Sequence, residues 1–188
     1  GHMIVEIGGG TSEIAIISLG GIVASTSVRI GGNKFDVAIQ EHIRRRYGLA
    51  IGERSSEDVK IQVGSALYLD NKLTMQVRGR DTITGLPRMV SVTSDDVTEA
   101  IEEELEGIIT AVKDVLQKSP PELSADVMDK GMVLSGGSSQ LRNLDHLLAR
   151  ATGVPAFVAD EPMLSVAKGT GIALDNLEAY KRSILATK

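Results

Sequence analysis

The sequence predicts an α/β protein that carries an inserted α+β subdomain, and three features of its 188 residues indicate this class. The first segment, 4–29, consists of apolar β-branched runs separated by glycines, which is typical of an antiparallel meander. The last third alternates strand, helix, strand and helix, which favours parallel pairing with helices packed on the sheet. The middle of the chain mixes helices with short strands. We therefore expect 4–32 and 129–188 to form one core subdomain, into which 33–128 is inserted.

The first segment contains three expected strands, at Ile4–Ile7, Glu13–Leu19 and Ile22–Arg29. Residues 1–3, GHM, are typical of a cleaved purification tag, so we leave them out of the fold prediction. A strand that begins directly behind such a remnant suggests that this chain was cut from a longer protein at a domain boundary.

The middle segment contains three stretches in which apolar residues follow the 3.6-residue period of a helix. These stretches are Phe35–Tyr47, a run from Ser55 to about Ala66, and a run from Val97 to about Lys118. The third is expected to begin at a Ser94-Asp95-Asp96 cap and to stop at Pro120-Pro121. Two short strands, Leu73–Arg78 and Met89–Val92, complete this α+β unit.

The last third contains the strand–helix pairs of the core. We expect strands at Gly131–Leu134 and Val154–Val158, and helices at Leu141–Thr152 and from Leu164 to about Tyr180.

The overall composition excludes several classes of function. A net charge of −5 gives no basic footprint, so we expect no nucleic-acid partner. No apolar run approaches the roughly 20 residues that a membrane-spanning helix needs. The chain has no cysteine, which excludes disulfides and zinc–thiolate sites and fits a reducing cytoplasm.

The turn Gly8-Gly9-Gly10-Thr11 joins two strands. Consecutive glycines in a tight turn can point several backbone N–H groups into one concavity, and such nests bind phosphate. The Thr11 hydroxyl adds a further donor. The alternative interpretation is a hairpin with a bulge and no ligand.

A second glycine-rich loop, LSGGSSQL at 134–141, joins a buried strand to a helix. Its free N–H groups would lie at the carboxyl edge of the sheet, where ligands of α/β proteins usually bind. The alternative is a serine cap on a tight loop.

Two helical patterns could also serve a ligand. Glu57 and Lys60 share a helix face and could reach a ribose or an adenine, or could simply form a solvated ion pair. Gly169 and Gly171 interrupt an apolar helix, and each destabilises it by roughly 1 kcal/mol relative to Ala. We expect close packing against a backbone or a ligand to compensate, and the alternative is a poorly started helix.

The order of these four patterns resembles the second lobe of the actin-like ATPases, the superfamily of actin, the heat-shock chaperone ATPases and the sugar kinases. The resemblance is closest to the MreB family of bacterial actins. Six stretches carry it: IVEIGGGTSEIAIISLGGIVASTSVRIGG, IGERSSEDVKIQVGSA, RGRDTITGLPR, PPELSADVMDKGMVLSGG, LRNLDHLL and VAKGTGIAL. It implies an actin-like ATPase lobe, with a ribonuclease H-like βββαβα core and an inserted subdomain.

The resemblance also implies the residues of an ATP/ADP site. The glycine hairpin would be a phosphate loop, the Glu-x-x-Lys helix a nucleoside contact, the second glycine loop an adenosine motif, and the Gly-Thr-Gly helix an interdomain connector. The implied cofactor-binding residues are Gly8, Gly9, Gly10, Thr11, Glu57, Asp58, Val59, Lys60, Gly136, Gly137, Ser138, Ser139, Gly169 and Gly171.

Two residues depart from the family pattern. The family usually has Asp where this chain has Glu6, and that carboxylate has a catalytic role in ordering Mg²⁺ and its water. Glu6 would act on the metal indirectly, through water, and its longer side chain puts metal geometry and hydrolysis rate in question. Ser138 replaces a third glycine of the adenosine loop.

The resemblance implies a slow ATPase that polymerises into filaments, maintains rod shape and guides cell-wall (peptidoglycan) synthesis. Its partners would be other copies of itself and the cell-wall and membrane morphogenesis proteins, at the inner face of the cell membrane in the cytoplasm. The first phosphate loop, the catalytic connector and the membrane-contacting surface would belong to a preceding lobe, so this chain alone should bind nucleotide weakly without hydrolysis. Two alternatives remain: a lobe of another superfamily ATPase or small-molecule kinase, and an interaction module whose glycines are only turns.

Overall fold

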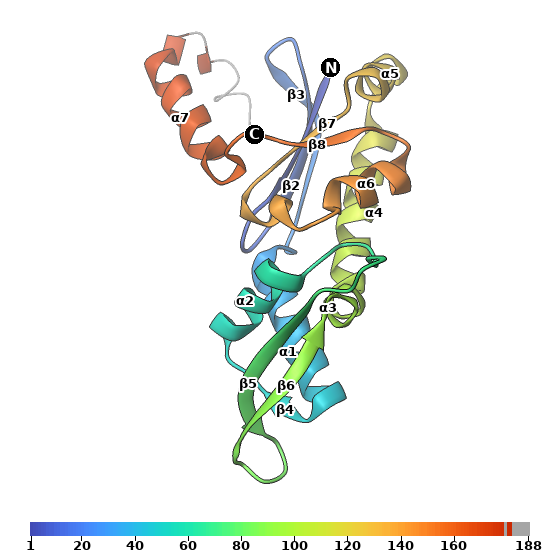
Figure 1. Ribbon diagram of the computed structural model, residues 1–188. Coiled ribbons are helices and arrows are strands. Elements are labelled where there is room, and N and C mark those ends of the chain that lie inside the picture. The colour runs from blue at the N-terminus through green and yellow to red at the C-terminus, as the bar shows by residue number, and fades with distance from the viewer. Residues whose placement is uncertain (179, 182–188) are drawn as a thin grey trace.

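The computed structural model describes residues 1–178, 180 and 181, which form two stacked subdomains (Figure 1). The core subdomain is built on a five-stranded sheet of order β3-β2-β1-β7-β8. Its strands are β1 (His2–Ile7), β2 (Ser12–Ser18), β3 (Gly21–Val28), β7 (Met132–Ser135) and β8 (Ala156–Val158). The meander is antiparallel, whereas β7 pairs in parallel with both β1 and β8. The α/β class predicted from the sequence is therefore confirmed.

The central strand β1 begins at His2, two residues earlier than expected. Alternate side chains Met3, Val5 and Ile7 are fully buried, so residue 3 packs in the core together with the two apolar positions that follow. Since β1 has neighbours on both sides, its last residues are held firmly where the glycine hairpin begins.

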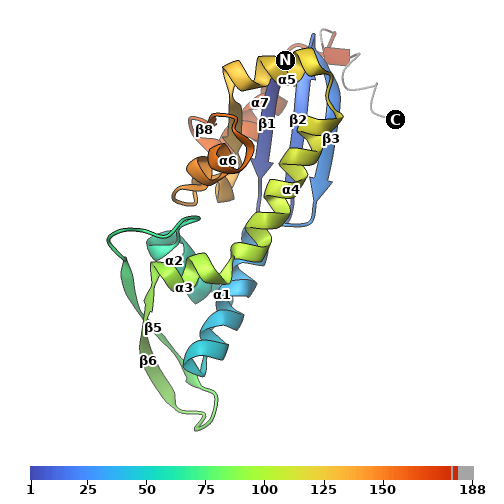
Figure 2. The same cartoon turned by 90° about the vertical axis from the view of Figure 1, so that its right-hand side faces the viewer.

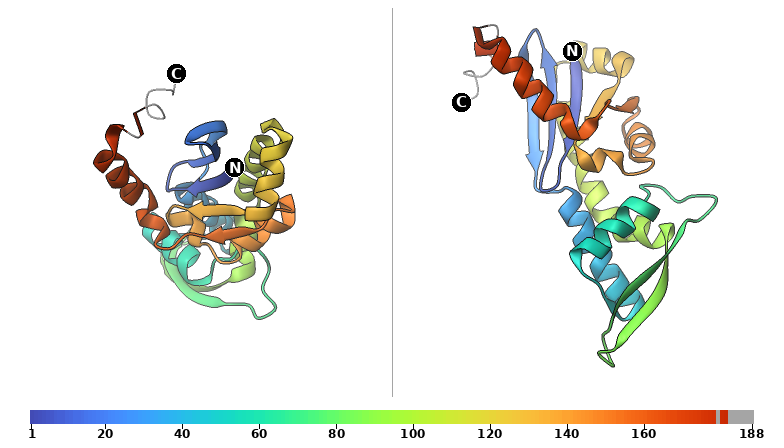
Figure 3. Two further views of the ribbon diagram at one scale, coloured as in Figure 1. Left: turned by 90° about the horizontal axis from the view of Figure 1, so that it is seen from above. Right: turned by 60° about the vertical axis from the view of Figure 1, so that its left-hand side comes forward.

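Helices cover both faces of the core sheet. On one face lie α4 (Glu102–Lys118), α5 (Pro121–Lys130) and α6 (Leu144–Thr152), with α4 running along β2 and β3 (Figure 2). On the opposite face lies α7 (Ser165–Asp175), as the view from above shows (Figure 3). The expected continuation of this last helix toward Tyr180 includes residue 179, which lies outside the described residues. None of the helices in the described part of the chain is both long and apolar enough to cross a membrane.

The second subdomain combines three helices with the antiparallel sheet β4-β5-β6. Its elements are α1 (Gly32–Tyr47), β4 (Leu49–Ala50), α2 (Glu53–Val63), β5 (Thr74–Asp81), β6 (Pro87–Thr93) and α3 (Ser94–Ala100). The two-residue strand β4 is too short to leave an alternating pattern, so the sequence did not predict it. Helix α2 begins two residues before the expected Ser55, after Gly52.

The single helix expected from Val97 to Lys118 is wrong, because the chain breaks into α3 and α4 at Ile101. The apolar period continues through the break, since Ile101 itself is fully buried. The cap is Thr93 rather than Ser94: its hydroxyl accepts from the Asp96 amide, and the Asp96 carboxylate accepts from the Thr93 amide. Because α4 packs on the core sheet, we propose that the inserted subdomain ends near residue 101 instead of 128.

Pro120-Pro121 ends α4 as expected, but Pro121 also opens α5, a helix that the sequence analysis did not predict. Proline is well tolerated at the first position of a helix, where its missing N–H is not needed. The second glycine loop forms a short 3₁₀ helix, Gly137–Gln140, so that α6 begins at Leu144 rather than Leu141.

Candidate functional site

A cavity of about 360 Å³ lies where the core and the inserted subdomain meet. The core contributes Gly9, Gly137, Ser138, Leu141, Arg142 and Met163 to its lining. The inserted subdomain contributes Gly32, Asn33, Asp36, Glu57, Lys60 and Ile61. The cavity therefore joins three of the four patterns that the sequence analysis selected.

The glycine hairpin forms one edge of this cavity. Gly8 N–H donates to the Thr11 carbonyl at 2.9 Å, and the carbonyls of Gly8 and Gly9 accept from the amides of Gly32 and Asn33 at 3.0 and 2.8 Å. Within the described residues, the amides of Gly9 and Gly10 donate to no other group, and both residues are exposed. The hairpin is thus fixed by its carbonyls, which leaves two N–H groups free.

The glycine identity of residue 10 has no explanation inside the chain. Its φ is not positive, and among the described residues a Cβ at this position would meet no atom within 4 Å apart from its chain neighbours. Gly31 contrasts with it, because a Cβ there would lie 2.6 Å from the Gly8 carbonyl oxygen. Packing therefore requires glycine at residue 31. At residue 10, the absence of a side chain instead leaves the backbone N–H accessible to a group that approaches from solvent.

The second glycine loop lies directly beside the hairpin. Gly136 has a φ of 84°, and a Cβ there would lie 2.3 Å from the Ile7 carbonyl oxygen. The Ser138 hydroxyl donates to the Gly8 carbonyl at 2.9 Å, and the buried Ser139 hydroxyl donates to the Gly136 carbonyl at 2.7 Å. Ser138, which departs from the family pattern, therefore connects the two loops without closing the cavity.

Helix α2 brings only part of its expected motif to the cavity. Glu57 and Lys60 line it, whereas Val59 is fully buried in the core and Asp58 lines a separate hollow with Arg78. Lys60 pairs with Asp36 at 2.9 Å. The solvated Glu57–Lys60 pair that we considered from the sequence is therefore not the arrangement found.

Glu6 is the last residue but one of β1, and its carboxylate lies beside both glycine loops. Its carboxylate oxygen would lie 3.3 Å from a Cβ at Gly8 and 2.6 Å from one at Gly136. Burial, with a smaller contribution from Glu13 opposite on β2, raises the pKa of the Glu6 carboxyl. The described residues contain no cluster of three or more metal-ligating side chains. A divalent ion here would therefore take most of its oxygens from a phosphate and from water, as Mg²⁺ commonly does.

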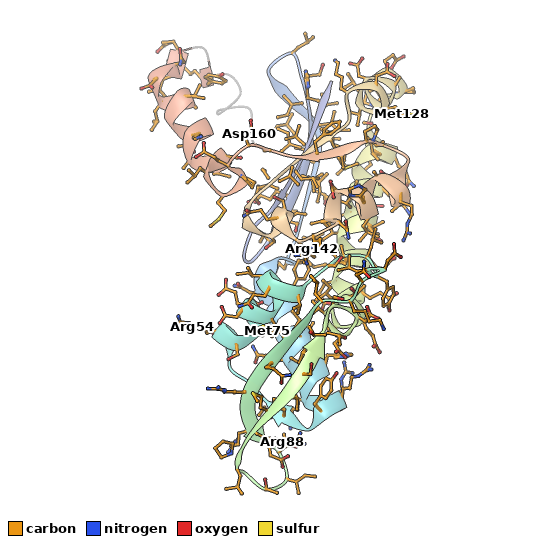
Figure 4. All side chains as sticks on the ribbon, viewed as in Figure 1. Arg54, Met75, Arg88, Met128, Arg142 and Asp160 are labelled. Carbon is orange, nitrogen blue, oxygen red and sulfur yellow. The ribbon has the colours of Figure 1, made fainter. Side chains whose placement is uncertain are left out.

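Asp36, Asn33 and Arg142 also line the cavity, and the sequence analysis missed them. Burial raises the pKa of Asp36, and its contact with Lys60 offsets part of that effect. Arg142, labelled at the junction in Figure 4, donates to the Gly64 carbonyl at 2.9 Å. The sequence offers one signal for Asp36, its position one helical turn after the pair Gly31-Gly32. Its partner Lys60 is 24 residues away in the chain, so no local spacing indicates the contact.

The Gly-Thr-Gly helix is not part of this cavity. Gly169 and Gly171 are exposed on α7, and within the described residues no atom lies within 4 Å of a Cβ at either position. The expected close packing around them is therefore not found in this chain.

Several known proteins are similar to this chain. The family profile described as MreB/Mbl protein matches residues 1–182. The cell shape-determining protein Mbl of Bacillus cereus is 47% identical over 98% of this chain and 56% of its own length. The cell shape-determining protein MreB of Escherichia coli K12 is 48% identical over 96% of this chain and 52% of its own length. The chain thus spans about half the length of these relatives.

Solved structures give the same result. MreB5 of Spiroplasma citri bound to ADP superimposes with a TM-score of 0.91 and 36% identity, over 98% of this chain and 55% of that one. The same protein bound to AMPPNP gives a TM-score of 0.90, over 95% of this chain and 54% of that one. The profile match, the sequence relatives and these structures agree, so the chain belongs to the MreB/Mbl family.

Proposed function

We propose that this chain is the second lobe of an MreB-like cytoskeletal protein and that its cavity binds ATP or ADP. The observation that carries the proposal is the pair of free amides at Gly9 and Gly10, on a hairpin kept open by glycine. Such a nest suits the β- and γ-phosphates. The binding of ADP and AMPPNP by MreB5, a structural relative, supports the same ligand class.

The nucleoside would occupy the remainder of the cavity. Ile61, Leu141 and Met163 offer apolar surface to a base, and the Glu57 carboxylate can accept hydrogen bonds from ribose hydroxyls. Lys60, Gly137 and Ser138 complete this end of the site, with Gly136 and Ser139 holding their loop. Asp58 and Val59 would contribute only through the backbone of α2.

Mg²⁺ would lie between the phosphates and Glu6. A single carboxylate beside a phosphate loop fits a metal that keeps most of its water ligands. The raised pKa of Glu6 fits a carboxyl that lacks a cation partner, which Mg²⁺ would supply.

The longer protein would place this nucleotide between two lobes, polymerise, and hydrolyse ATP slowly by in-line attack of a positioned water. Gly169 and Gly171 would join the two lobes there. Filaments at the inner face of the cell membrane, acting with cell-wall synthesis and membrane morphogenesis proteins, would maintain rod shape. This chain by itself would bind nucleotide weakly and would not hydrolyse it.

Amide NMR titration with Mg-ADP into the millimolar range tests the site. We expect residues near 8–11, 57–61 and 136–142 to shift together on one weak binding curve. Gly10→Val should weaken binding at least tenfold, because within the described residues the new Cβ meets no neighbour, whereas a bound phosphate would obstruct the side chain. Gly21→Val, at the other turn of the meander, is the matched control.

Unchanged spectra at saturating Mg-ADP, or equal affinities for the two valine variants, would contradict the proposed site. The wider proposal is tested on the longer protein, which should form ATP-dependent polymers. A monomer that persists at high concentration with Mg-ATP would count against it.

A further inference from the structure

The ammonium group of Lys60 is held by acceptors of the chain itself. Its Nζ lies 2.9 Å from one Asp36 carboxylate oxygen, and it donates to the other at 3.0 Å and to the Gly32 carbonyl at 3.3 Å. Of the three N–H donors of a lysine ammonium, two therefore make hydrogen bonds within the described residues, and the Asp36 Oδ1 oxygen lies close as an ion-pair partner without accepting one. The two side chains are only 13% and 14% exposed, so this ion pair is largely removed from water although both residues line the cavity.

The pair fixes the ammonium at one point beside the phosphate hairpin. A Cβ at Gly32 would lie 3.3 Å from Lys60 Nζ and 2.6 Å from the Ser138 hydroxyl, so both groups flank this glycine. Ser138 in turn donates to the Gly8 carbonyl, and the Gly32 amide donates to the same oxygen. A continuous polar chain therefore runs from α2 through the start of α1 to both glycine loops.

Stability alone gives a weak reason for such a pair. Removing two charges from water is costly, and well-packed apolar residues often stabilise a protein as well or better. The neighbouring carboxylates Glu57 and Glu53 also repel Asp36, which adds to its cost in this position. Asp36 nevertheless lies at the cavity wall, where it pairs with Lys60.

We propose that Asp36 is a positioning residue that holds Lys60 against Gly32, so that the ammonium is immobilised before a nucleotide arrives. This inference rests on the proposed function of the cavity. An immobilised side chain loses little conformational freedom on binding, whereas a free lysine would have to be ordered by the ligand. Without Asp36, the ammonium keeps only the Gly32 carbonyl and is no longer held at this position.

A double-mutant cycle measures whether Asp36 acts through Lys60. Asp36→Asn should weaken Mg-ADP binding three- to tenfold by NMR titration, and Lys60→Met should do the same or more. The double variant should bind no more weakly than Lys60→Met alone, because Asp36 has no role once the ammonium is gone. Asp36→Glu should restore part of the affinity, and Glu41→Gln, an exposed change on the same helix, should leave it unchanged.

A second readout does not depend on nucleotide. The ¹⁵N signal of the Lys60 ammonium should be observable in the free chain, because its protons are hydrogen-bonded and shielded, and should be lost in Asp36→Asn. Additive effects in the cycle, or an ammonium signal that survives Asp36→Asn, would overturn the positioning role while the nucleotide site stands. Absence of Mg-ADP binding to the unmodified chain would instead overturn the proposed function and, with it, this role.

Discussion

Asp96 is a buried carboxylate of the inserted subdomain that accepts three hydrogen bonds. Its side chain is only 1% exposed, and it accepts from the Thr93 amide and hydroxyl at 2.8 and 2.7 Å and from the Tyr47 hydroxyl at 2.9 Å. Arg46 lies 3.1 Å away and His42 3.5 Å away. One carboxylate therefore connects the end of α1 to the start of α3.

Asp96→Asn should lower the free energy of unfolding by about 3 kcal/mol at neutral pH, since it leaves buried donors and a charge without their partner. Burial by itself raises the pKa of Asp96, but the hydrogen bonds from Thr93 and Tyr47 and the charge of Arg46 outweigh it and lower the pKa below its ordinary value of 3.8. The stabilisation is therefore complete above pH 3.8 and is lost as the pH falls through the folded-state pKa.

Urea unfolding at pH 7 and at pH 3 measures this effect. The difference in unfolding free energy between the unmodified chain and Asp96→Asn should be smaller at pH 3 than at pH 7. Asp129→Asn is the control, because that carboxylate is exposed. A constant difference at both pH values would contradict the assignment.

Gly136→Ala tests the contact between the two glycine loops. The new methyl group would lie 2.3 Å from the Ile7 carbonyl oxygen, and the φ of 84° disfavours any side chain. We expect a loss of about 2 kcal/mol or more of unfolding free energy, from strain and from displacement of the loop. Gly10→Ala should lose less than about 1 kcal/mol in the same urea experiment, because its methyl group meets no neighbour. Equal losses would show that the loops are not in the described contact.

At the scale of the elements, the sequence predicted those helices, strands and loops whose signals are local in the chain. The meander, α1, the parallel strands and the two glycine loops were found, because turn glycines and helical periods are local signals. The break at Ile101 was missed because a buried residue in a non-helical conformation leaves the apolar period intact. The Asp36–Lys60 pair was missed because its contact depends on how two helices pack, which no spacing within either helix records.

Helix α4 should unfold with the core sheet rather than with the inserted subdomain. Ile108 is fully buried where α4 packs along β2 and β3, so Ile108→Ala should cost about 2–5 kcal/mol. In Ile108→Ala, the protection of backbone amides against hydrogen exchange should fall in α4 and β1–β3 together and should change less in α1–α3. Glu106→Ala, on the exposed face of the same helix, is the control. Equal loss of protection in both subdomains would contradict the proposed boundary near residue 101.

Helix α7 has its two glycines in open surroundings, so replacing them should strengthen it. Gly169→Ala and Gly171→Ala should each stabilise the helix by about 0.5–1 kcal/mol, since alanine lowers the entropy of the unfolded chain and meets no neighbour. Hydrogen exchange of the α7 amides should slow by roughly two- to fivefold for each change. Faster exchange in either variant would reveal a contact at these glycines.

At the scale of the whole molecule, the cavity lies at the junction between the two subdomains. Few backbone hydrogen bonds among the described residues connect one subdomain to the other. The Gly8 and Gly9 carbonyls hold the start of α1 from one side. From the other side, Arg142 donates to the Gly64 carbonyl at 2.9 Å and its own carbonyl accepts from the Ala66 amide at 2.8 Å. A ligand that touches both walls therefore adds contacts between parts that could otherwise open separately.

Mg-ADP should accordingly stabilise both subdomains together. At ten times its dissociation constant, a ligand that binds only the folded state adds about 1.4 kcal/mol to the free energy of unfolding. We expect hydrogen exchange to slow by up to about tenfold in α2 and in 136–142 alike, because opening either wall releases the nucleotide. Gly10→Val should reduce the slowing to about twofold or less at the same concentration, because its dissociation constant is at least tenfold higher, whereas Gly21→Val should retain the full effect. Protection confined to one subdomain would mean that the ligand contacts one wall only, and the coupling of the two subdomains through this cavity would then have to be abandoned.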